Sequence, residues 1–134
     1  MGKRRREPEW VERLVINAVH LDQLREHGGA VGTRDENAFE SALARPSNRW
    51  LYEPDFDLAT LATAYGWGLT TSHPYLDGNK RVAFLAMAVF VGLNGYEIEA
   101  LEEDVVKVML AVAAGHCSEE ELATWVRAHL VGTG

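Results

Sequence analysis

Apolar residues recur along this chain at spacings of three and four, which place them on one face of an α-helix. Residues 9–26 carry the first such stripe, made of Trp10, Leu14, Ala18, Leu21 and Leu24. Gly28 and Gly29 follow it as a helix stop signal. The pattern therefore predicts a first helix over residues 9–26.

A shorter stripe predicts a second helix over residues 36–45, with Phe39, Ala42 and Leu43 on one side. Pro46 is expected to end this helix, because proline lacks the N–H that a helix interior requires. Residues 46–57 are rich in Pro, Asn and Asp, which indicates a loop.

A third helix is expected over residues 58–71, with Asp57 as its N-cap. Gly66 and Gly68 lie inside this segment although glycine is a poor helix former. We interpret the two glycines as places where a neighbouring element packs closely.

Residues 82–93 (VAFLAMAVFVGL) are apolar on nearly every side, which is typical of a helix at the buried centre of a domain. Asn94-Gly95 is expected to end it, and residues 96–99 form a short piece that fits an extended strand. Acidic residues at 102–104 open a further helix to about residue 114, where they favour the positive end of the helix dipole. Ser118 and Glu121 form a capping box for the last helix, which ends near Leu130.

These elements predict an all-α fold of about six helices around the central apolar helix, in a single domain over residues 1–134. Residues 1–8 are expected to be a frayed basic N-terminus. The net charge of −7 argues against a nucleic-acid binder, since phosphate backbones are held by basic surfaces. Cys117 is the single cysteine, and the longest apolar run is too short to span a membrane, which favours a cytoplasmic location.

The segment 73–81 (His-Pro-Tyr-Leu-Asp-Gly-Asn-Lys-Arg) precedes the apolar helix and holds most of the candidate chemistry. Helix N-termini present unpaired N–H groups and the positive end of the dipole, which bind anions. Gly78 permits close approach of a ligand, and Asn79, Lys80 and Arg81 add an amide and two cations. Cations are unfavourable at the start of an isolated helix, so the pattern predicts a bound phosphate.

Two more side chains of this segment offer catalytic chemistry. Asp77 supplies a carboxylate for Mg²⁺, which proteins commonly hold with one or two carboxylates and substrate phosphates. His73 is a candidate general base for a hydroxyl nucleophile. Each residue alone is more often structural, so the hypothesis depends on their combination within nine residues. No P-loop pattern and no His or Cys zinc pattern is present in the chain.

These nine residues resemble the signature of the Fic/Doc family: His, any residue, an aromatic, any residue, an acid or Asn, Gly or Ala, Asn, Gly or Lys, Arg. A chance match in this chain is on the order of one in a million from average residue usage. Further similarity to the Doc branch of the family covers roughly residues 10–130. It includes the segments His27-Gly28-Gly29, Arg34-Asp35, residues 43–46, Ala64-Tyr65, Asn94-Gly95 and Leu122-Ala123 with Trp125.

The resemblance implies roles for the residues of the signature. His73 would be the general base that accepts the proton of a target hydroxyl, and Asp77 would hold Mg²⁺. Gly78, Asn79 and Arg81 would bind the nucleotide phosphates, with Arg81 also supporting catalysis. Tyr75 stands where Phe is commoner in the family, so its hydroxyl needs a partner or water.

Lys80 bears on which reaction the resemblance implies. Most Fic enzymes transfer AMP from ATP and have glycine at this position, whereas Doc proteins have lysine and are thought to transfer the γ-phosphate. Doc proteins are toxins of bacterial toxin–antitoxin modules that phosphorylate a threonine of elongation factor Tu and halt translation. We therefore expect a Doc-like kinase that uses ATP and Mg²⁺, with a Phd-like antitoxin as its partner.

Two alternative functions and the role of one segment remain open from the sequence. The protein could be an AMP transferase of the Fic type, or a non-catalytic nucleotide-binding component of an autoregulated toxin–antitoxin complex. Residues 32–46 could be a flap that docks the target or a helix of the scaffold. The internal inhibitory pattern of many Fic proteins, Ser or Thr followed four residues later by Glu, is absent, which favours restraint by a separate antitoxin.

Overall fold

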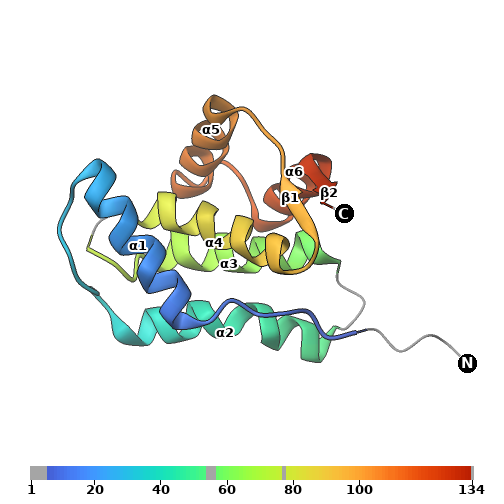
Figure 1. Ribbon diagram of the computed structural model, residues 1–134, viewed down its shortest axis with the longest axis horizontal. Helices are drawn as coiled ribbons and strands as arrows, with labels where there is room; N and C mark the ends of the chain where they lie inside the picture. Colours follow the sequence, from blue (N-terminus) through green and yellow to red (C-terminus); the bar gives the residue numbers. More distant parts are fainter. Residues whose placement is uncertain (1–5, 54–56, 77, 134) are drawn as a thin grey trace, which may run out of the picture.

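The computed structural model describes residues 6–53, 57–76 and 78–133. The described residues form six helices and two short strands (Figure 1). The elements in chain order are α1 (Arg13–His27), α2 (Glu36–Tyr52), α3 (Leu58–Ser72), α4 (Asn79–Leu93), β1 (Tyr96–Ile98), α5 (Glu102–Ala113), α6 (Glu119–His129) and β2 (Leu130–Gly132). The all-α fold class predicted from the sequence is confirmed.

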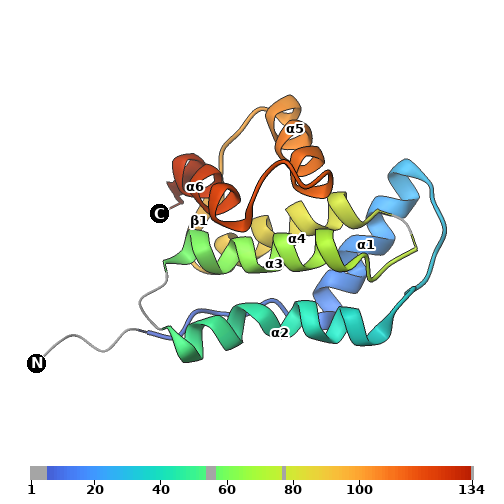
Figure 2. The same ribbon diagram turned by 180° about the vertical axis from the view of Figure 1, so that it is seen from behind.

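The centre of the molecule is a pair of helices. The apolar helix α4 lies beside α3, with α2 on the far side of α3 and α5 and α6 on the opposite side (Figures 1 and 2). Helix α3 buries ten of its 15 residues, and α4 buries six of its 15. The short loop between α3 and α4 holds the segment that carries the candidate chemistry.

The two glycines of α3 are contact points, as predicted. A Cβ atom at Gly66 would lie 2.4 Å from Sδ of Met87 in α4. A Cβ atom at Gly68 would lie 3.2 Å from the Arg45 side chain and 3.4 Å from the backbone of Ala42 in α2. Because glycine has no side chain, α3 approaches its neighbours on both sides.

Helix N-caps follow the sequence closely. Asp57 accepts a hydrogen bond from the Thr60 amide at the start of α3. Ser118 and Glu121 form the reciprocal capping box of α6, in which each side chain accepts from the other residue's amide. Asp35 caps α2 by accepting from the amide of Ala38. These caps satisfy donors that a helix start leaves unpaired.

The expectation that Pro46 ends the second helix is wrong. Helix α2 continues through Pro46 to Tyr52, so residues 46–52 are helical rather than part of a loop. Pro46 is buried among the contacts of α2, and Arg45 and Arg49 on either side of it bind Glu119 of α6. Tertiary contacts thus outweigh the loss of one helical hydrogen bond.

The first helix also differs from its prediction. It begins at Arg13, because hydrogen bonds hold the preceding backbone in an extended conformation. The Asn94 side chain accepts from the Glu9 amide and donates to the Glu9 carbonyl, and the Tyr65 hydroxyl accepts from the Val11 amide. Its buried face consists of Ile16, His20 and Leu24, whereas the predicted stripe residues Leu14 and Leu21 are exposed. The buried stripe therefore includes a histidine.

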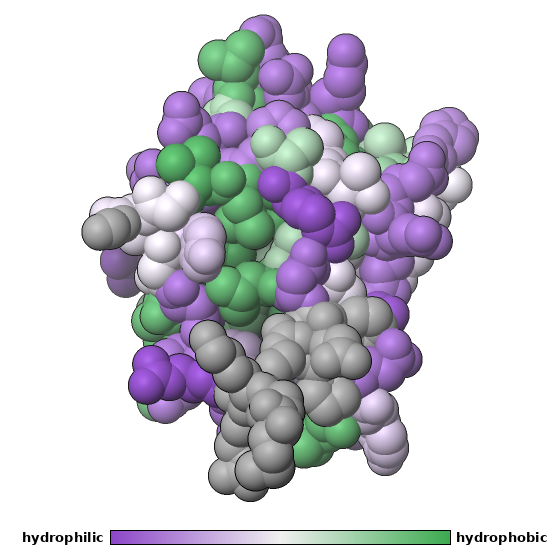
Figure 3. Space-filling model, turned by 90° about the vertical axis from the view of Figure 1, so that its right-hand side faces the viewer, coloured by the Kyte–Doolittle hydropathy of each residue, from purple (hydrophilic) through white to green (hydrophobic). Residues whose placement is uncertain are grey.

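Strand β1 fulfils the expectation of an extended piece after Gly95, and it pairs with β2 in antiparallel register, Ile98 opposite Leu130. The sequence did not predict β2. Figure 3 views this side of the molecule, where apolar side chains gather in a strip among polar ones. Exposed apolar residues of this part of the chain are Leu93, Tyr96, Leu101 and Val131. Within the described ranges, no helix has the length and apolar character needed to cross a membrane.

Replacing Gly66 by alanine tests the close contact between α3 and α4. The new methyl group would overlap the Met87 side chain, which is fully buried and would have to shift. We expect Gly66→Ala to lower the free energy of unfolding by about 1–3 kcal/mol in urea titrations. Gly92→Ala is the matched control, because a Cβ atom there meets nothing within 4 Å and alanine favours the helix. Equal effects of the two substitutions would contradict the packing argument.

Candidate active site at the N-terminus of α4

The loop that follows α3 begins with a left-handed residue. His73 is the C-cap of α3 and has φ 48° and ψ 56°, and it is the one non-glycine residue with positive φ in the described part of the chain. This conformation costs a non-glycine residue about 1–2 kcal/mol. The side chain of His73 is exposed, so the imidazole is available to a ligand at the surface. Strain at an exposed histidine is typical of a functional position.

Asn79 closes the same loop. Its Oδ1 accepts from the amide of Tyr75 at 3.0 Å, and its Nδ2 donates to the carbonyl of Tyr75, also at 3.0 Å. The carboxamide therefore fixes the loop against the first turn of α4. The structure gives Asn79 a positioning role in addition to the nucleotide contact that the sequence predicts.

The N-terminus of α4 differs from the starts of α2, α3 and α6. Its N-cap is Gly78, with φ 81°, and no side chain among the described residues caps it. The first backbone bond there runs from the amide of Val82 to the carbonyl of Gly78 at 3.0 Å. Lys80 and Arg81 are exposed, and neither forms an ion pair within the described ranges.

These features fit a phosphate group. A Cβ atom at Gly78 would lie 3.6 Å from Nη2 of Arg81, so the absence of a side chain keeps the space beside this guanidinium open. Amide donors, the helix dipole and two cations that form no ion pair with a described residue all favour an anion at this position. Asp77, the predicted Mg²⁺ ligand, lies outside the described residues.

Residues 32–35 lie against the loop. Thr33 and Tyr75 form an isolated antiparallel bridge, and the amide of Leu76 donates to the carbonyl of Gly32. The amide of Arg34 donates to the carbonyl of Pro74, and its Nε donates to the carbonyl of His73 at 3.1 Å. Residues 32–46 therefore have two parts. The residues up to Asp35 flank the candidate site, and those after Asp35 belong to helix α2 of the scaffold.

The sequence analysis missed two residues of α1 that lie beneath this loop. The hydroxyl of Tyr75 donates to Oδ1 of Asn17 at 2.9 Å, and the ring of His20 stacks on the ring of Tyr75. Burial raises the pKa of Tyr75 well above its usual value, so the phenol stays protonated and donates. His20 could have been recognised as a histidine on the buried face of α1. The predicted stripe, however, shares only Leu24 with that face.

The chain belongs to the Fic/Doc family, whose model matches residues 10–91. The chain is also 33% identical over 101 residues to a protein named Toxin Doc from Mycolicibacterium smegmatis. This similarity covers 72% of the chain and 76% of that relative. The family predicted from the sequence is therefore confirmed.

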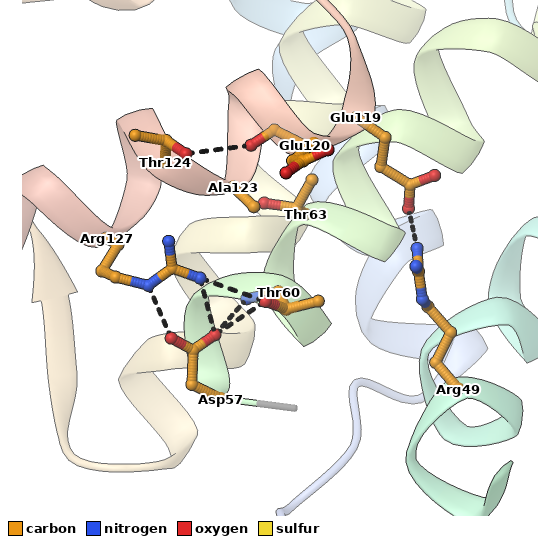
Figure 4. A pocket seen from close by; sticks show the side chains of 9 residues that line it. All are labelled: Arg49, Asp57, Thr60, Thr63, Glu119, Glu120, Ala123, Thr124 and Arg127. Atoms are coloured by element: carbon orange, nitrogen blue, oxygen red, sulfur yellow. Dashed lines mark hydrogen bonds and ion pairs between the residues drawn. The ribbon is translucent and has the colours of Figure 1, made fainter. Parts of the chain in front are cut away.

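A cavity of about 670 Å³ lies elsewhere, between α2, α3 and α6 (Figure 4). It adjoins the first turn of α3, whereas the candidate active site follows the last turn of that helix. Its lining residues are Arg49, Asp57, Thr60, Thr63, Glu119, Glu120, Ala123, Thr124 and Arg127. Because it lies at the opposite end of α3, this cavity is separate from the Fic/Doc signature.

Four of the five charged residues that line this cavity, Arg49, Asp57, Glu119 and Arg127, form ion pairs across the helices. Nε of Arg127 lies 2.6 Å from Oδ2 of Asp57, and Glu119 binds both Arg45 and Arg49 (Figure 4 draws the Arg49 contact). The hydrogen bonds from Arg127 hold the pKa of Asp57 at about 2. We interpret these ion pairs as links that hold α6 to α2 and α3.

Relief of the strain at His73 is measurable. Glycine adopts the left-handed conformation without a Cβ penalty, so we expect His73→Gly to raise the free energy of unfolding by about 1 kcal/mol. His73→Ala removes the same imidazole and keeps the penalty, so it serves as the control. Chemical denaturation that finds the two variants equally stable would show that the left-handed turn is unstrained.

The pair between Asp57 and Arg127 predicts a pH dependence of stability. The folded pKa of Asp57 lies below its unfolded value of 3.8, so its contribution is present above about pH 4 and is lost as the pH falls through 2. Because both side chains are about half exposed, we expect Asp57→Asn to cost only about 1 kcal/mol at pH 7.

Thermal melts of wild type and Asp57→Asn from pH 7 towards pH 2 test this expectation. The stability difference between the two proteins should shrink below about pH 4. Glu120→Gln is the control, because Glu120 lines the same cavity and its side chain makes no ion pair with the described residues. A difference that stays constant over this pH range would contradict the assignment.

Proposed function

We propose that this protein is a Doc-like toxin that transfers the γ-phosphate of ATP to a Ser or Thr hydroxyl of a target protein. The supporting observation is the N-terminus of α4, where Gly78 leaves room beside Arg81 and neither Lys80 nor Arg81 pairs with a described carboxylate. A helix start with this composition binds an anion. The family of transferases to which the chain belongs gives that anion its identity as a nucleotide.

Each residue of the signature has a role in this proposal. The amides at Gly78 and Asn79 and the guanidinium of Arg81 bind phosphate oxygens, while Lys80 adds a second positive charge. Asp77 would hold Mg²⁺, which neutralises phosphate charge when bound. Asn79 and the contacts of residues 32–35 keep the loop in the shape that presents these groups.

His73 would serve as the general base at the exposed edge of the site. The imidazole accepts the proton of the target hydroxyl as the hydroxyl oxygen forms a bond to the γ-phosphorus. The bond from that phosphorus to the bridging oxygen of ADP breaks, and ADP leaves with the electron pair. Arg81 stabilises the negative charge on the transferred group.

Lys80 favours γ-phosphate transfer over AMP transfer, because a lysine side chain fills space that glycine leaves open for deeply placed phosphates. Transfer of AMP is the alternative, and a non-catalytic nucleotide-binding role is the second alternative. An exposed histidine held in a strained turn, in the loop that precedes the proposed phosphate site, favours catalysis over simple binding.

The expected target is elongation factor Tu, and the expected partner is a Phd-like antitoxin. Both are what the resemblance to the Doc branch implies, and the similarity to a protein named Toxin Doc supports that resemblance. The internal inhibitory pattern is absent from this chain, so restraint by a separate protein accompanies the proposal.

Labelled ATP distinguishes these functions. We expect purified protein with Mg²⁺ and bacterial lysate to move label from the γ-phosphate, and not from the α-phosphate, onto a protein of the size of elongation factor Tu. His73→Ala should lower the rate by at least about 100-fold, the usual contribution of a general base. His116→Ala is the control, because His116 is exposed and lies between α5 and α6. Label from the α-phosphate would establish AMP transfer instead, and no label from either position would contradict both enzymatic proposals.

A further inference from the structure

Helix α1 places a histidine directly beneath the candidate phosphate loop. His20 is only 3% exposed, and its ring centroid lies 3.7 Å from that of Tyr75, with an angle of 13° between the planes. The two rings are therefore stacked nearly flat against each other. Tyr75 belongs to the loop, whereas His20 lies 55 positions earlier in the chain, so the contact joins α1 to the loop.

The same imidazole also lies next to Gly78. A Cβ atom at Gly78 would lie 3.7 Å from Cδ2 and 3.9 Å from Nε2 of His20, and 3.6 Å from Nη2 of Arg81. The N-cap of α4 is thus close to the buried ring of His20 as well as to the exposed cation of Arg81. A smaller side chain at position 20 would leave a gap next to Gly78, the N-cap at which the phosphate is expected.

Other contacts hold the stack in place. The Tyr75 hydroxyl donates to Asn17, one turn before His20 on the same helix. The Phe39 ring of α2 also packs against the Tyr75 ring, with the two ring centroids 5.2 Å apart. The guanidinium of Arg13 in α1 lies over the Phe39 ring. Arg13 also binds Glu36 and Glu40 of α2. Helices α1 and α2 are therefore tied together around the ring that His20 supports.

We propose that His20 is a positioning residue of the active site: its flat ring, stacked on Tyr75 and adjacent to Gly78, sets the position of the phosphate loop relative to α4. This inference rests on the proposed nucleotide site. Because His20 is buried beneath the loop, its proposed role is to position loop residues rather than to touch the nucleotide. Its contacts with Tyr75 and Gly78 connect it to the proposed nucleotide site.

Two substitutions distinguish an effect of the stacked ring from a general loss of stability. His20→Ala removes the ring, and we expect the dissociation constant of MgATP, measured by calorimetry, to rise about tenfold. His20→Phe keeps a flat ring that can stack on Tyr75, and we expect it to bind MgATP within about threefold of wild type. Rescue by Phe is the result that general destabilisation would not produce.

Ile16→Ala is the matched control. Ile16 lies one turn before His20 on the buried face of α1 and lines a small gap with Val82 and Ala86 of α4. We expect this variant to lose stability and to keep the MgATP affinity of wild type. Three results would overturn the proposal: unchanged affinity in His20→Ala, equally weak binding by His20→Phe, or equally weak binding by Ile16→Ala.

Hydrogen exchange tests the positioning role without a nucleotide. The amide of Tyr75 donates to Asn79, and that of Leu76 donates to Gly32. We expect both amides to exchange at least about tenfold faster in His20→Ala and near the wild-type rate in His20→Phe, while amides in the middle of α4 stay protected. If wild type fails to bind MgATP but the two variants show these exchange rates, the proposed function fails and the positioning role stands. Unchanged loop exchange in His20→Ala would overturn the positioning role.

Discussion

The shape of the candidate active site depends on two hydrogen bonds between the Asn79 carboxamide and the backbone of Tyr75. They fold the loop back onto the first turn of α4 and leave Gly78, rather than a capping side chain, at the start of that helix. The donors and the dipole of α4 are therefore directed at the space beside Arg81. An anion in this space would compensate for two cations that are unfavourable at a helix N-terminus.

The rest of the fold supports this loop from three directions. Helices α3 and α4 pack closely through Gly66, which fixes the two ends that the loop joins. Residues 32–35 pair with the loop on one side, and His20 stacks beneath it. A short irregular segment, which by itself has few contacts, thus gains a defined shape from α1, α3, α4 and the segment before α2.

The sequence predicted most of what local chemistry controls. The N-cap of Asp57, the capping box of Ser118 and the contact role of Gly66 were readable because each depends on a residue and its near neighbours. The helical span of Pro46 and the extended backbone before Arg13 were not, because distant partners decide them: Glu119 anchors α2, and Asn94 holds the chain at Glu9. Strand β2 also depends on a distant partner, β1.

The candidate site divides in the same way. Its signature residues are consecutive and could be recognised in the sequence, whereas Asn17 and His20 come from a helix more than 50 positions away, and only the fold brings them beneath Tyr75. The wrong stripe for α1 arose because Leu14 and Leu21 also recur at helical spacing, although both are exposed. Periodicity alone did not distinguish the two faces of this helix.

The central claim is that the N-terminus of α4 binds nucleotide phosphates, and an amide chemical-shift titration of the labelled protein with MgATP tests it most directly. We expect the largest shifts at the amides of residues 78–82, and we expect Arg81→Ala to abolish them. Shifts centred instead on the cavity around Thr60 and Glu120, or no shifts at millimolar MgATP, would contradict it.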